Sequence, residues 1–92
     1  MNYVVTHRFI ADVITDEAMR PHVEYLRRLF EEGKLLVTGP FTDRSGGGMF
    51  ILDVSDEDEL NRIVDNDPAI TSSISEATVR PYQVVFFKTC EG

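Results

Sequence analysis

The stretch of residues 20–40 constrains the fold more than any other part of the chain, because it predicts one helix, a glycine stop and one strand. Apolar side chains recur within it at helical spacing, with charged residues between them. These apolar residues are Val23, Leu26, Leu29 and Phe30. Gly33 predicts the end of the helix, because glycine enters the left-handed cap conformation cheaply. A short apolar run over residues 34–38, closed by Gly39 and Pro40, then predicts a buried strand followed by a turn.

The predicted helix begins at about Pro21 and ends at about Glu32, since proline in the first turn loses no hydrogen bond. Residues 10–19 have no convincing period of their own. Thr15, Asp16 and Glu17 could cap a helical turn that runs into Arg20, but the residue before a proline is disfavoured in a helix. An irregular or kinked segment is therefore expected before Pro21. On this reading His22 lies in the first helical turn, at the edge of an apolar face.

Three further strands and a second helix complete the predicted order. Residues 3–9 have the β-branched and aromatic content of a strand, residues 49–54 predict another, and residues 77–87 predict the last. Pro81 within the last strand indicates an edge position, a bulge or a break. The second helix starts at Ser55, whose hydroxyl can accept from the first free N–H groups. The order strand, helix, strand, strand, helix, strand is the split βαβ arrangement of the ferredoxin-like α+β fold.

Such a fold has an antiparallel sheet with both helices on one face, so the other face has no intramolecular cover. Pairing with a second copy would cover it, and we expect a homodimer or a higher homo-oligomer. The length of 92 residues allows one small domain, taken as residues 1–92.

Charge and cysteine content exclude several classes of protein. Sixteen acidic against nine basic residues give a net charge of −7, which argues against a nucleic-acid or anionic-membrane partner. A lone cysteine, Cys90, excludes an intrachain disulfide framework. The sequence has no signal-peptide pattern and no apolar run near the ~20 residues that cross a bilayer. We therefore expect a soluble cytoplasmic protein.

His22 is the strongest candidate for chemistry. The positive end of a helix disfavours imidazolium, which leaves a neutral ring able to take a proton near neutral pH. A carboxylate on the second ring nitrogen would fix its tautomer and raise its basicity. Asp67, at the end of the second helix, is the candidate for that carboxylate. The alternatives are a histidine satisfied by a backbone carbonyl and a routine Asp-Pro turn.

Other motifs point to no cofactor and no metal. Gly46, Gly47 and Gly48 are followed by no Lys-Ser/Thr and open no helix, so they form no phosphate loop. Two histidines and one terminal cysteine supply no spaced metal-ligand set. His7, on the first strand, could line a cavity, but a single histidine on a half-buried strand is more often structural. No nucleophile signature is present.

Several short motifs in order resemble the YciI-like (YCII-related) family over residues 3–87. They are Arg20-x-His22-x-x-Tyr25-Leu26, Gly33-Lys34-Leu35, Gly39-Pro40, a glycine before the third strand, and Asp67-Pro68. The resemblance implies a dimeric α+β barrel with His22 and Asp67 as a catalytic dyad. It implies a pocket wall from Gly39 and Pro40 to Asp43, and it leaves open whether Asp67 or Asp43 is the partner of His22. Apart from the resemblance, Arg20 is expected to bind substrate, and Arg8, Arg20 and Arg44 could supply local positive charge for an anionic one.

These observations favour a cofactor-independent enzyme that moves a proton on a small organic molecule. Isomerase, lyase and dehydrohalogenase chemistry all fit, and the resemblance includes a dehydrochlorinase that acts on a chlorinated hydroquinone. The alternative from another class is a non-catalytic module, in which a dimer holds a small ligand or supports a partner protein. A third possibility, a monooxygenase, would require an aromatic-lined cavity and an electron-rich phenol.

Overall fold

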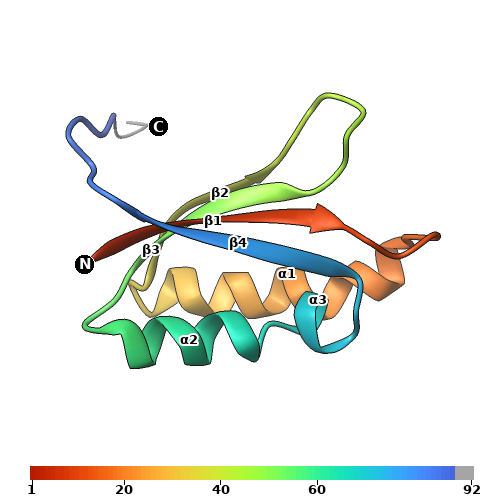
Figure 1. Cartoon of the computed structure of the whole chain (residues 1–92), viewed down its shortest axis with the longest axis horizontal. Coiled ribbons are helices and arrows are strands. Elements are labelled where there is room, and N and C mark those ends of the chain that lie inside the picture. Colours follow the sequence, from red (N-terminus) through yellow and green to blue (C-terminus); the bar gives the residue numbers. More distant parts are fainter. Residues whose placement is uncertain (89–92) are drawn as a thin grey trace.

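The computed structural model describes residues 1–88 and contains one four-stranded sheet with three helices on a single face (Figure 1). In chain order the elements are β1 (Asn2–Phe9), α1 (Asp16–Glu31), β2 (Leu35–Pro40), β3 (Gly48–Asp53), α2 (Glu57–Asp65), α3 (Pro68–Thr71) and β4 (Ser75–Tyr82). All neighbouring strands pair antiparallel in the order β2-β3-β1-β4. The predicted ferredoxin-like α+β fold is therefore confirmed. Among the described helices, none is long and apolar enough to cross a bilayer.

The core lies between the sheet and the helices. Alternate residues of β1 point toward the helices, so Tyr3, Val5 and His7 are buried. Val5 pairs with Phe50 on β3 and with Val79 on β4, which continues the apolar layer across the sheet. The helices close this layer with Leu26, Leu29, Leu60 and Ile63. Burial of such side chains is the main stabilising contribution to a small domain.

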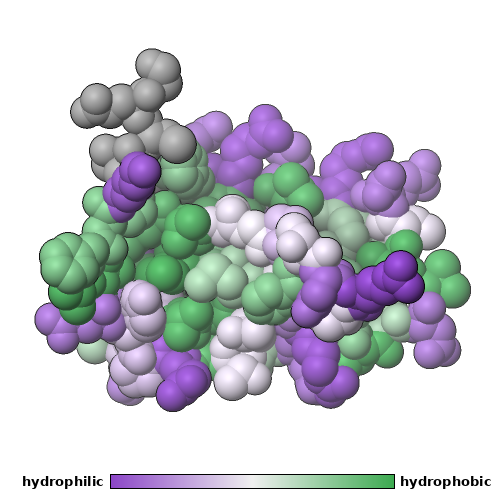
Figure 2. All heavy atoms as spheres, turned by 90° about the horizontal axis from the view of Figure 1, so that it is seen from above, coloured by the Kyte–Doolittle hydropathy of each residue, from purple (hydrophilic) through white to green (hydrophobic). Residues whose placement is uncertain are grey.

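The opposite face of the sheet has no helix over it. Val4, Thr6 and Arg8 of β1 point to this face, and Val37 and Ile51 pair there across β2 and β3. Figure 2, seen from above, shows a hydrophobic area toward one end of this face and hydrophilic residues along its margins. An uncovered apolar area of this kind favours self-association, and the dimer stays a prediction.

Helix α1 begins five residues earlier than the sequence predicted. Thr15 caps it, because the Thr15 hydroxyl accepts from the backbone N–H of Ala18 at 3.0 Å. Pro21 lies inside the helix, so the predicted start at Pro21 was wrong. The cap and the acidic first turn outweigh the restriction before proline. His22 consequently lies in the second turn, where the charge of the helix end has little effect.

Other boundaries also differ from the prediction. Gly39 and Pro40 belong to β2, where they pair with β3, and the turn follows them. Proline is tolerated there because β2 is an edge strand. Helix α2 is capped by Asp56 and not by Ser55, since the Asp56 carboxylate accepts from the N–H of Glu59 at 2.8 Å.

Strand β4 ends earlier than predicted. Its last residue is Tyr82, and the exposed side chains of Val85, Phe86 and Phe87 follow outside the strand. Strand β4 lies at the edge of the sheet opposite to β2. An edge position was one of the three explanations given above for Pro81 within a strand. Cys90 lies outside the described residues.

Candidate active site

His22 and Asp67 meet inside the molecule, although 45 positions separate them in the sequence. The Nδ1 atom of His22 lies 2.6 Å from Oδ1 of Asp67, and both side chains are buried. A carboxylate oxygen can only accept here, so Nδ1–H donates and Nε2 is the ring nitrogen left for a ligand. Asp67 thus fixes the tautomer and the orientation of the ring.

Asp67 is held in place by the start of α3. It is the N-cap residue of that short helix, and its Oδ1 also accepts from the N–H of Ala69 at 2.9 Å. The sequence placed this carboxylate at the end of α2, and it does follow Asn66, the C-cap of that helix; the sequence did not predict that it also caps α3. Pro68 provides the first residue of α3, where a missing N–H costs nothing.

His7 is a third member of this cluster. Its Nδ1 atom lies 2.7 Å from the Ser75 hydroxyl, and its Nε2 atom lies 3.6 Å from Oδ2 of Asp67. The rings of His7 and His22 are 5.2 Å apart between centroids. Burial lowers the pKa of His7, the nearby Asp67 charge opposes this, and His22 adds to the lowering. The sequence interpretation missed this contact, because alternation on β1 shows that His7 faces inward but not what it meets.

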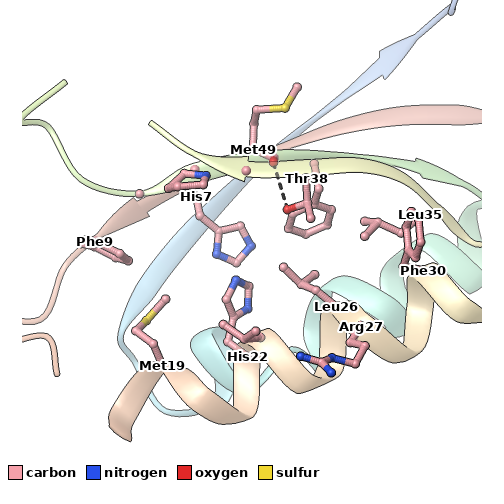
Figure 3. Close-up of a pocket in the computed structure, with 16 residues that line it drawn as sticks. His7, Phe9, Met19, His22, Leu26, Arg27, Phe30, Leu35, Thr38 and Met49 are labelled. Carbon is pink, nitrogen blue, oxygen red and sulfur yellow. Dashed lines mark hydrogen bonds between the residues drawn. The ribbon is translucent and has the colours of Figure 1, made fainter. Parts of the chain in front are cut away.

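A cavity of about 490 Å³ opens between α1 and the sheet, with the two histidines in its lining (Figure 3). The rings of His7 and His22 point toward one another in the close-up, and Leu26, Leu35 and Phe50 form apolar wall. Val23 and Phe30, which the sequence assigned to the core stripe, are 49% and 59% exposed and line this cavity. Their apolar side chains therefore lie at a pocket and not in a packed interior.

The remaining predicted site residues divide into two groups. Gly39 and Pro40 line the cavity, as the resemblance implied. Arg20 and Asp43 are exposed and are not among the lining residues, whereas Arg27 is. Hydrogen bonds from the hydroxyl and the N–H of Ser45 lower the pKa of the Asp43 carboxyl. Asp43 is thus occupied within its own loop, and the carboxylate beside His22 is Asp67. The substrate-binding roles of Arg20 and Asp43 stay predictions.

The glycine run has a structural part in the site. Gly47 has a φ of +79° and lies against the backbone of β1, where a Cβ atom would overlap the carbonyl oxygen of His7. Its N-terminal neighbour Gly46 has a φ of +78° and packs on the ring of Phe9. Only glycine allows this close approach without strain. The run therefore brings β3 in beside His7 and the cavity.

His7, His22 and Asp67 are also of the residue types that bind zinc, and their nearest ligand atoms lie within 4.8 Å of one another. Two ligands on one tetrahedral zinc, each ~2.0 Å from it, lie about 3.3 Å apart. The 2.6 Å between His22 Nδ1 and Asp67 Oδ1 is a hydrogen-bond distance. The 3.6 Å between His7 Nε2 and Asp67 Oδ2 is close to the spacing of two zinc ligands, so the His22–Asp67 contact is a hydrogen bond, whereas the His7–Asp67 spacing also suits two ligands of one ion.

Comparison with known proteins gave consistent matches. Residues 1–85 match the YCII-related domain. The uncharacterised protein YjpA of Bacillus subtilis (strain 168) is 32% identical over 68 residues, which are 74% of this chain and 79% of that protein. The structure resembles 5-chloro-2-hydroxyhydroquinone dehydrochlorinase (TftG) of Burkholderia phenoliruptrix AC1100, solved with 2,5-dihydroxybenzoquinone. The TM-score is 0.76 at 21% identity, over 90% of this chain and 94% of that one. An antibiotic biosynthesis monooxygenase shares the fold, with a TM-score of 0.57 and 20% identity over 92% and 99% of the two chains.

Proposed function

The chain belongs to the YCII-related family, and we propose that it is an enzyme in which His22 exchanges a proton with a small organic ligand. The observation that carries the proposal is the 2.6 Å contact between His22 and the buried Asp67 at the wall of a cavity. Asp67 orients the ring and balances the charge when Nε2 takes a proton. A positioned base of this kind contributes about 10²–10⁴-fold to the rate, which suits an already activated substrate.

The cavity favours a flat, mainly apolar ligand with an acidic hydroxyl at one end. The cavity walls are mainly apolar side chains, such as those of Leu26 and Phe50. The imidazole rings of His7 and His22 lie next to each other in the lining. An apolar ring would bury against these walls while its hydroxyl reaches Nε2 of His22. Hydroxylated benzoquinones and hydroquinones have this shape and acidity, and 2,5-dihydroxybenzoquinone is bound by the structural neighbour TftG.

Two reactions need no more than one protein base. In an isomerisation, a proton leaves one ligand atom for Nε2 and returns to another atom. In an elimination, Nε2 takes the proton while an anion such as chloride leaves with the electron pair of its bond. In both reactions, release of the proton from Nε2 returns His22 to its neutral form.

The ligand class is tested by titration with 2,5-dihydroxybenzoquinone and by an assay of chloride release from 5-chloro-2-hydroxyhydroquinone. Val23→Trp should weaken binding at least about tenfold, because the added ring fills a partly exposed position that lines the cavity. Val13→Trp, in an exposed loop outside the cavity, is the matched control and should bind as the parent does. Chloride release supports the proposal. Tight binding without turnover would favour the ligand-binding module, and equal binding by both variants would place the ligand elsewhere.

We further propose that two copies pair through the helix-free face of the sheet. Val4 points to this face from central strand β1 and is only partly exposed. Val4→Glu should therefore convert a dimer to a monomer in light scattering after gel filtration, since a charge cannot be buried unpaired in an apolar interface. Val13→Glu should stay dimeric. A parent protein that is monomeric at micromolar concentration would refute the pairing.

A further inference from the structure

His7 and Ser75 have no part in the proton transfer proposed above, yet both are buried, His7 next to Asp67 and Ser75 against His7. Their exposed fractions are 5% and 3%. Within residues 1–88, neither Nε2 of His7 nor Oδ2 of Asp67 has a hydrogen-bond partner, and these buried atoms face each other at 3.6 Å. A closure of about 0.7 Å would bring them to the usual N–H···O distance. Each atom is therefore the available partner of the other.

The hydrogen bond with Ser75 determines whether Nε2 of His7 carries a proton that it can donate to Asp67. A neutral imidazole carries its proton on one nitrogen only, and the other nitrogen accepts. If the Ser75 hydroxyl donates to Nδ1, the proton of His7 lies on Nε2 and points at Oδ2 of Asp67. The opposite tautomer would direct a lone pair at the carboxylate in a buried site, which is unfavourable.

We infer that His7 is a positioning residue for the dyad: Ser75 fixes it as the neutral Nε2–H tautomer, and its N–H holds the second oxygen of Asp67. The carboxylate then lies between two imidazoles, with Oδ1 on His22 and Oδ2 on His7. The inference rests on the proposed role of His22, but its test observes the rings themselves and not turnover alone.

The charges around His7 agree with a neutral donor. It meets His22 from α1, Asp67 from the start of α3 and the uncharged Ser75 hydroxyl from β4. The nearby Tyr25 hydroxyl donates to the carbonyl of Ile63, and burial, with the Asp67 charge, raises the pKa of Tyr25. Burial and the neighbouring His22 lower the pKa of His7 by more than the Asp67 charge raises it, so a neutral ring that donates a hydrogen bond agrees with this direction. The Asp67 charge then remains available to His22.

Long-range ¹H–¹⁵N NMR of the unmodified protein is the primary test, because it reads the tautomer of each histidine directly. We expect His7 with its proton on Nε2 and His22 with its proton on Nδ1. His7 found protonated on Nδ1 would overturn the inference. A crystal structure with water or an added Zn²⁺ ion bridging His7 Nε2 and Asp67 Oδ2 would overturn it as well.

Variants separate positioning from a merely structural role. His7→Leu removes the donor, so the His22–Asp67 hydrogen bond should shorten and its N–H resonance should move downfield. His7→Gln retains a donor at the Nε2 position and should restore most of the parent spectrum. Turnover should fall about 10–100-fold in His7→Leu, because the dyad is misplaced, and by clearly less in His7→Gln. An unmoved resonance in His7→Leu would leave His7 structural and refute the inference. If that variant does not fold, Ser75→Ala provides a second comparison: Nδ1 of His7 loses its partner, and the share of the Nε2–H tautomer should be smaller than in the parent protein, whereas an unchanged share would refute the role of Ser75.

Discussion

Replacing His22 with glutamine is expected to lower kcat for chloride release from 5-chloro-2-hydroxyhydroquinone by about 10²–10⁴-fold. Glutamine can still donate an N–H to Asp67, so the buried carboxylate keeps its partner. It cannot accept a proton at neutral pH, which removes the one property that the proposed mechanism needs. Binding of 2,5-dihydroxybenzoquinone should change much less than kcat, since most of the contact area of the cavity is apolar.

Glu31→Gln is the matched control, because it makes an isosteric change at an exposed residue of the same helix that does not line the cavity. Its kcat should stay within about twofold of the parent, as is usual for a surface substitution away from the site. Circular dichroism and thermal unfolding should show both variants folded. A His22→Gln protein with unchanged kcat/KM would end the enzymatic account of this cavity. The family, the fold and the ligand-binding alternative would remain.

The order of strands and helices could be predicted from the sequence, because each element has a local signal that packing does not override. The β-branched and aromatic content of residues 3–9 predicted β1, and the polar start after residue 54 predicted α2. Gly33, with a φ of +77°, follows α1 in the left-handed region that its position suggested. These signals act over a few residues and are visible in the sequence alone.

Most of the failures depend on contacts between distant segments, whereas the start of α1 was missed although its cap is local. The spacing of Val23 and Phe30 matches a core stripe, and spacing cannot distinguish a core from the wall of a cavity. Pro21 was taken as a helix start, but capping by Thr15 extends the helix past it. His7 was interpreted alone, and its partners Asp67 and Ser75 are 60 and 68 positions away.

The His22–Asp67 pair could be predicted from the sequence only in part. Helical periodicity places His22 on the inner side of α1, but nothing local indicates that the start of α3 brings a carboxylate to it. The resemblance to the YCII-related family supplied that pairing. The structure adds the contact itself and the position of Asp67 as a helix cap. Its catalytic role stays a proposal until the variants are measured.

Replacing Asp67 with alanine should cost about 2–4 kcal/mol of unfolding free energy, the largest stability effect that we expect from a single polar side chain here. Its side chain is almost fully buried, with 1% exposed. It accepts from His22 and from the N–H of Ala69, and it faces His7. Alanine would leave these donors buried without an acceptor and would remove the cap of α3.

Urea unfolding at a fixed protein concentration measures this cost, because a dimer makes the midpoint depend on concentration. Asp65→Ala is the control. It removes an exposed carboxylate two positions earlier, at the end of α2, and should change stability by less than about 0.5 kcal/mol. Asp67→Asn keeps an acceptor for the cap but loses the charge beside His22, so it should retain most of the stability while losing turnover. If Asp67→Ala proved as stable as Asp65→Ala, Asp67 would not anchor α1 to α3, and the geometry required for proton transfer would lack its support.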